Sequence, residues 1–95
     1  MNIQTFHTED KPLQTKIIFT ASEGKVISIQ MEKDAILKEH ITKVPAMLIC
    51  IDGEVCFENE HNMTQVLKNG DYINIEENVK HWLTASLKSN LILIK

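Results

Sequence analysis

The chain has 95 residues and a formal net charge of −3, which is enough for one domain with a modest core. Its ten basic residues are all lysines and form no cluster, so we expect no nucleic-acid partner, because phosphate binding needs concentrated positive charge. No apolar run approaches the roughly 20 residues of a membrane-spanning helix. The start is polar rather than signal-like, so we expect a cytoplasmic protein without membrane contact.

Short strands separated by turns are predicted along the chain, because thirteen isoleucines against four alanines favour extended structure. Residues 1–14 form a polar leader, for which a loose segment and a late first strand both remain open. We expect strands at 16–20, 26–31, 36–42, 46–51, 54–58, 63–67, 72–75, 81–85 and 91–94. This rhythm predicts an all-β single domain over residues 1–95, an antiparallel β-barrel or double-stranded jelly roll of about eight or more strands.

Between residues 46 and 58 the sequence resembles a β-hairpin. Asp52-Gly53 is a two-residue turn signal, since both residue types tolerate positive φ. The resulting register puts Cys50 and Cys56 on opposite faces of the sheet, so we expect no disulfide between them. The face predicted to line the interior consists of Ala46, Leu48, Cys50, Val55 and Phe57.

The outer face of the same segment carries an apolar stripe made of Met47, Ile49 and Ile51. Such a stripe needs a cover, either a second chain or the N-terminal segment folded over it. Two-fold dimers are the commonest oligomer, so we expect a homodimer.

Two histidines end short motifs with fixed spacing. His40 lies in ILKEHIT, where alternation places Ile36, Lys38, His40 and Thr42 on one side, and Gly53 follows downstream. His81 closes the run GDYINIEENVKHW, in which Gly70 begins the motif and Asn78 stands at a turn position. Together, on an all-β pattern, these motifs resemble the two motifs of the cupin superfamily, in particular a small single-domain cupin. The resemblance covers roughly residues 25–95.

The resemblance implies a metal site of three histidines and one glutamate, a donor set suited to iron, manganese, nickel or zinc. Only His40 and His81 are kept here, because Thr42 and Ala46 stand at the other two positions. Two imidazoles alone rarely hold a divalent ion, so we expect a degenerate site at which a metal binds weakly or not at all. Cys50 is a possible third ligand, although a small buried hydrophobe is the better interpretation.

The resemblance and the strand alternation also predict a ligand pocket, lined by His40, Thr42, Ala46, Leu48, Phe57 and His81. We expect a small molecule to bind in this barrel without a metal. A metal-dependent isomerase or dioxygenase with a reduced ligand set remains an alternative, and so does an oligomeric scaffold. The residues assign no catalytic group and no ligand identity, and they leave open whether the protein is an enzyme.

Overall fold

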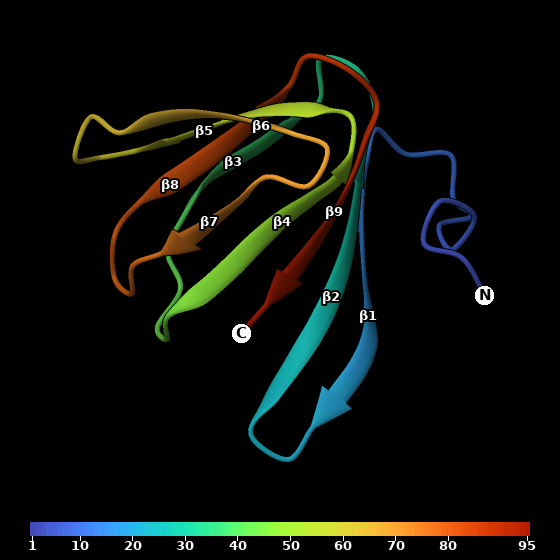
Figure 1. Cartoon of the computed structure of the whole chain (residues 1–95), viewed down its shortest axis with the longest axis horizontal. Helices are drawn as coiled ribbons and strands as arrows, with labels where there is room; N and C mark the ends of the chain where they lie inside the picture. Colours follow the sequence, from blue (N-terminus) through green and yellow to red (C-terminus); the bar gives the residue numbers. More distant parts are fainter.

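A computed structural model describes residues 1–95 as nine strands in two antiparallel sheets that face each other (Figure 1). The strands are β1 Leu13–Ala21, β2 Gly24–Met31, β3 Ile36–His40, β4 Ala46–Asp52, β5 Glu54–Asn59, β6 Thr64–Lys68, β7 Tyr72–Ile75, β8 His81–Ala85 and β9 Ser89–Ile94. The larger sheet has the order β1-β2-β9-β4-β7, and the smaller one β3-β8-β5-β6. The predicted all-β jelly roll is therefore confirmed. The structure contains no helix long and apolar enough to cross a membrane.

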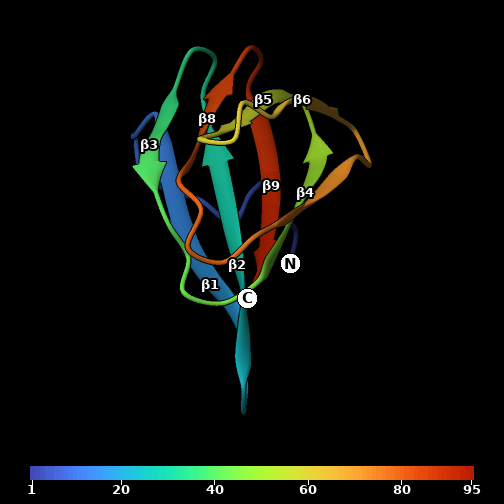
Figure 2. The same cartoon turned by 90° about the vertical axis from the view of Figure 1, so that its left-hand side faces the viewer.

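The core lies between the inner faces of the two sheets, which Figure 2 shows from the side of the smaller sheet. Along β4, Ala46, Leu48 and Cys50 are buried, whereas the intervening Met47 and Ile49 are only partly buried. Val55 and Phe57 face the same core from β5. The predicted inner face is therefore confirmed, because a strand alternates its side chains between its two faces.

The predicted hairpin at Asp52-Gly53 is wrong. β4 pairs with β7 and β9, whereas β5 pairs with β6 and β8, so the turn carries the chain from one sheet to the other. Gly53 has a φ of 107°, and a Cβ there would stand 2.3 Å from Ser89 Oγ. The Asp-Gly pair thus marks a sharp reversal but does not decide which strand becomes the partner. Cys50 and Cys56 are both free.

A second difference lies in β3, where strict alternation was predicted. The pairing with β8 matches Leu37 with Leu83 and His40 with His81, so two residues intervene on β3 where only one intervenes on β8. This bulge turns Leu37 and His40 toward the core and leaves Ile36 58% exposed. Ile36 and Lys38 therefore do not share the side of His40.

The N-terminal leader, residues 1–12, contains no strand and lies beside β1 on the outside of the larger sheet (Figure 1). Its polar side chains form hydrogen bonds with a polar row of the sheet. Gln4 Nε2 donates a hydrogen bond to Asp52 Oδ2 at 2.7 Å, and His7 Nε2 lies 2.8 Å from Ser28 Oγ. Beneath the leader, Asn90 Nδ2 donates to Asp52 Oδ1 at 2.8 Å.

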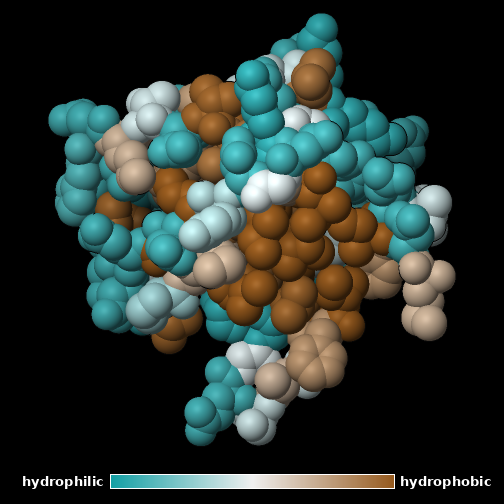
Figure 3. Space-filling view, viewed as in Figure 1, coloured by the Kyte–Doolittle hydropathy of each residue, from teal (hydrophilic) through white to brown (hydrophobic).

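Below this polar row the outer face of the larger sheet is apolar. Cross-strand neighbours join Val26 with Ile94 and Ile94 with Met47, and they join Ile92 with Ile49. Figure 3 shows the resulting apolar surface over β2, β9 and β4, which we call the outer apolar face. Its exposure follows from the register, since every second residue of these strands must point away from the core.

Candidate ligand site

Two imidazole rings meet at one end of the interior. The last residue of β3, His40, pairs in register with the first residue of β8, His81, and their ring centroids are 4.1 Å apart. The ring of Phe57, on the neighbouring β5, stacks on His81 with centroids 5.6 Å apart and an interplanar angle of 21°. His81 is only 2% exposed. Three of the six predicted pocket residues therefore form one aromatic cluster.

Hydrogen bonds to the main chain fix the tautomer of both rings. His40 Nδ1 lies 3.0 Å from the carbonyl oxygen of Lys38, and His81 Nδ1 lies 3.1 Å from that of Val79. A carbonyl oxygen can only accept, so each Nδ1 carries the proton and each neutral ring keeps a bare lone pair on Nε2.

The Nε2 atom of His81 has no protein partner. No completely buried side-chain nitrogen or oxygen in the structure lacks a hydrogen-bond partner. It follows that this Nε2 is in contact with solvent-accessible space, although the residue as a whole is almost fully enclosed. A buried ring with one reachable acceptor atom is suited to receive a donor from a small ligand.

The surroundings of His81 keep its ring neutral. Burial lowers the pKa of His81 below its usual value, and the charges of His40 and Lys95 lower it further, while the hydrogen bond to Val79 opposes this effect. At neutral pH, Nε2 is therefore a hydrogen-bond acceptor or a base, not a proton donor.

The other predicted pocket residues are buried, in different surroundings. Leu48 is buried in the core, and Ala46 is buried at the start of β4. Thr42 is also buried, and its hydroxyl donates a hydrogen bond to the carbonyl oxygen of Val44 at 2.8 Å. The Thr42 hydroxyl therefore stabilises the loop between β3 and β4.

Thr42 also lines a cleft of about 580 Å³ at the open end of the sandwich. The cleft lies between residues 20–25, at the tip of the β1–β2 hairpin, and residues 41–44, and it includes Lys95. Lys25 and Lys95 were not predicted as site residues. The sequence did contain an indication for Lys95. Leu91, Leu93 and Lys95 stand at every second position, so strand alternation puts a charged side chain on the inward side.

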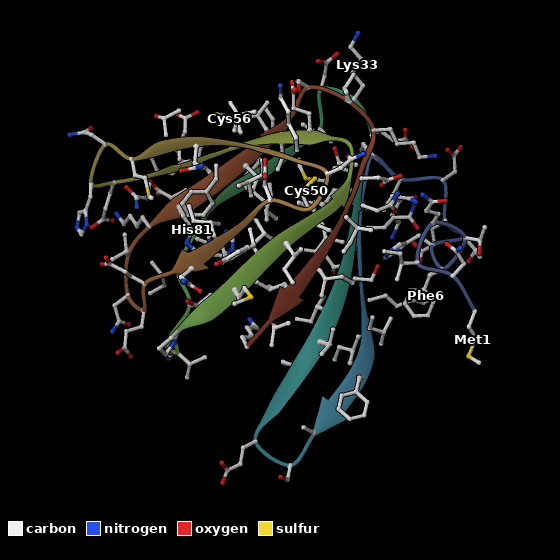
Figure 4. The ribbon with its side chains drawn as sticks, in the orientation of Figure 1. Met1, Phe6, Lys33, Cys50, Cys56 and His81 are labelled. Atoms are coloured by element: carbon white, nitrogen blue, oxygen red, sulfur yellow. The ribbon has the colours of Figure 1, made fainter.

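The donor atoms at the histidine pair do not fit the metal that the cupin resemblance implies. No group of three or more histidine, cysteine, aspartate or glutamate side chains is arranged to hold a metal ion. Cys50 lies in the core, where burial above all raises the pKa of its thiol to about 11, so it is not a thiolate. Figure 4 marks the positions of Cys50 and His81.

Comparison with known proteins places the chain by its fold. No family model matches the sequence, and no curated protein does. A cupin superfamily protein from Desulfitobacterium hafniense matches with a TM-score of 0.86 and 8% identity, over 98% of this chain and 84% of that chain. An RmlC-like cupin from Desulfovibrio desulfuricans matches with a TM-score of 0.84 and 12% identity, over 98% of this chain and 90% of that chain.

A cupin-like protein from Thermotoga maritima is 24% identical, with a TM-score of 0.79 over 87% of this chain and 67% of that chain. The resemblance to small cupins is therefore confirmed at the level of the fold. A shared fold does not assign a function, because function depends on the site that the fold carries.

Proposed function

We propose that this cupin-fold protein binds a small organic molecule at the His40–His81 pair, without a resident metal. The observation that carries the proposal is that the Nε2 atom of His81 is accessible to solvent, although the rest of the residue is enclosed. The neutral imidazole of His81 offers an acceptor to a ligand hydroxyl, and Phe57 supplies an apolar wall beside it.

One observation favours the metal-dependent alternative. Histidines that ligate a metal usually donate their other ring N–H to a carbonyl or carboxylate, and both Nδ1 atoms here have such a partner. The absence of a third donor weighs against it, because catalytic sites of this kind use three protein ligands. An isomerase or dioxygenase with a reduced ligand set is therefore the second candidate.

Nuclear magnetic resonance of isotope-labelled histidine side chains tests the two candidates. The protein is titrated with a fragment set of small alcohols, acids and amides, and separately with Zn²⁺. We expect fragments to shift the imidazole signals of His40 and His81 but not of the exposed His61. Tight stoichiometric Zn²⁺ binding at this pair, with no fragment response, would favour the metal-dependent candidate.

We also propose that the protein forms a homodimer through the outer apolar face. Support comes from the continuity of this face across β2, β9 and β4. Apolar surface exposed to water costs about 25 cal/mol of free energy per Å², so covering it with a second copy of the chain lowers the free energy. The cytoplasmic location stays a prediction.

A further inference from the structure

Polar contacts hold the leader to the larger sheet at three places. Near its start, the side chain of Gln4 donates a hydrogen bond to a carboxylate of β4. In its middle, His7 Nε2 lies 2.8 Å from Ser28 Oγ. Toward its end, Gln14 Nε2 donates to the carbonyl oxygen of Glu9 at 2.6 Å, and Glu9 N donates to Gln14 Oε1 at 3.1 Å. Among the groups that form these contacts, the imidazole of His7 is the one whose charge normally changes between pH 5 and 8.

The contact between His7 and Ser28 closes off a polar group in the sheet. Ser28 is 0% exposed, and the His7 ring is the only hydrogen-bond partner of its hydroxyl. Ser28 points to the outer face of β2, because its neighbours Ile27 and Ile29 pack into the core. If the leader left the sheet, this hydroxyl would be exposed to water.

The ring of His7 has a cation nearby and no free carboxylate. Lys16 Nζ lies 4.8 Å from the centroid of the Phe6 ring, which Figure 4 labels beside β1, and the rings of Phe6 and His7 meet edge to face with centroids 5.5 Å apart. The charged side chains that line one small cavity of about 190 Å³ together with His7 are Glu9, Lys11 and Lys16. Glu9 is already paired with Lys11 at 2.6 Å.

A proton on His7 would therefore be partly buried beside Lys16, without a compensating charge. Asp10 and Asp52 do not line the cavity, and Asp52 already accepts hydrogen bonds from two amide side chains. In agreement with this geometry, burial above all, and then the charge of Lys16, lowers the pKa of His7 below its usual value. A released leader would regain the ordinary pKa, so protonation of His7 favours release.

We propose that the leader is an acid-released strap: when His7 takes up a proton, residues 1–8 leave the outer face of the larger sheet while the two-sheet core stays folded. The core does not need these residues for its strands, since β1 begins only at Leu13. Above about pH 6.5 His7 is neutral and the strap stays bound, and its binding weakens as the pH falls below that value. Release uncovers Ser28 on the outer face.

Nuclear magnetic resonance of the full-length protein between about pH 7.5 and 5 tests the strap. The amide chemical shifts of residues 2–8 report its release, and amide exchange in β2 and β9 reports the state of the core. As the pH falls, we expect the amides of residues 2–8 to move to random-coil positions while the strands keep their protection. The imidazole of His7 should titrate below about pH 6.5 in the same experiment.

Variants identify the titrating group. His7→Gln keeps a side chain that can donate to or accept from Ser28 Oγ but does not titrate, so residues 2–8 should give the same shifts at both ends of the pH range. Lys16→Gln removes the neighbouring cation, so His7 should titrate at a higher pH than in the parent protein. His61→Gln, in an exposed turn, is the matched control and should behave as the parent does.

Leader shifts that do not change with pH in the parent protein, or that change equally in His7→Gln, would overturn the proposal. So would a loss of strand protection together with the leader shifts, because that result means unfolding of the core. If His7→Gln releases the leader at every pH, Lys16→Gln decides: an unchanged titration of His7 overturns the strap, and a titration at higher pH supports it.

Discussion

The two site histidines owe their chemistry to main-chain carbonyls two residues upstream. The carbonyl oxygens of Lys38 and Val79 each accept a hydrogen bond from an Nδ1–H, so the Nε2 atom of each ring is free to accept a hydrogen bond. Neither carbonyl could be recognised from residue types, because every residue has one. The sequence therefore identified which histidines meet but not which of their nitrogen atoms is available.

The titration of His81 predicts a pH-dependent stability. Because burial lowers its pKa in the folded state, the unfolded chain takes up the proton first as the pH falls below about 6.5. The stability that neutral His81 contributes is thus complete above the unfolded pKa and decreases as the pH falls toward the lowered folded value. Urea unfolding from about pH 7.5 to 5 should show this loss.

The variant His81→Gln should flatten this profile, since its side chain does not titrate. His61→Gln, in an exposed turn, is the matched control and should keep the profile of the parent. His7 also has a pKa lowered by burial and by Lys16, so His81→Gln is expected to reduce the slope without removing it. An unchanged slope in His81→Gln would contradict the assignment.

Two glycines at positive φ form a second test at the scale of the residue. Gly53→Ala should destabilise the fold by at least about 3 kcal/mol, because a strained backbone and a collision combine there. Its Cβ would lie 2.3 Å from Ser89 Oγ and 2.5 Å from the carbonyl oxygen of Lys88. Gly70→Ala shares the positive φ but meets nothing within 4 Å, so it should cost only about 1 kcal/mol. Equal losses in thermal or urea unfolding would be the contrary result.

At the scale of the element, strand positions were predictable because apolar and polar residues alternate. The limits predicted for 72–75 and 81–85 coincide with β7 and β8, and the two cysteines lie on the sides expected. Strand pairing was less accessible. Asp52-Gly53 predicted a hairpin, but the sharp turn joins the two sheets. Local residue preferences set the backbone angles of a turn and do not decide which strand pairs with which.

The polar row under the leader predicts a local loss of stability. Asn90 accepts a hydrogen bond from Gln30 Nε2 at 3.0 Å and donates one to Asp52 Oδ1 at 2.8 Å, and it is almost completely buried. Asn90→Ala should therefore lower the free energy of unfolding by about 1–3 kcal/mol, because Gln30 would keep a buried donor without its partner. Denaturant unfolding measures the difference.

Asn74→Ala is the control for that change. Asn74 lies on β7 of the same sheet and is exposed, so its loss should change stability by less than about 0.5 kcal/mol. If Asn90→Ala were as mild as Asn74→Ala, the buried hydrogen bonds of Asn90 to Gln30 and Asp52 would not contribute to stability as argued.

For the whole molecule, the main expectation is the dimer. Ile49→Glu places a charge in the middle of the outer apolar face and should convert the dimer to a monomer in light scattering at high micromolar concentration. Val66→Glu is the matched control, because Val66 is 48% exposed on β6 of the smaller sheet. It should leave the mass unchanged.

Circular dichroism accompanies both measurements, because a variant that does not fold says nothing about assembly. If Ile49→Glu loses its β-sheet spectrum, Ile94→Lys provides the same test nearer the end of β9, where the side chain is already 41% exposed. A parent protein that is monomeric, with Ile49→Glu folded and equally monomeric, would contradict the dimer.

The global architecture was accessible from the sequence, whereas the charge at the open end was not. Motif spacing predicted the jelly roll because the turns and buried strands of this fold leave local traces. Lys25 and Lys95 are 70 positions apart in the chain and come together only through the pairing of β2 with β9. Such a juxtaposition follows from topology, which no local pattern reports.

The bulge in β3 means that the imidazole pair does not depend on one particular strand length. Two residues, Lys38 and Glu39, span the interval between Leu37 and His40, where the partner strand uses one. Deleting a single codon for either residue would leave one intervening residue on each strand, so regular alternation would keep the imidazole on the side of Leu37 and opposite His81. In evolutionary terms, a homologue could lose the bulge through one small deletion and still retain the imidazole pair.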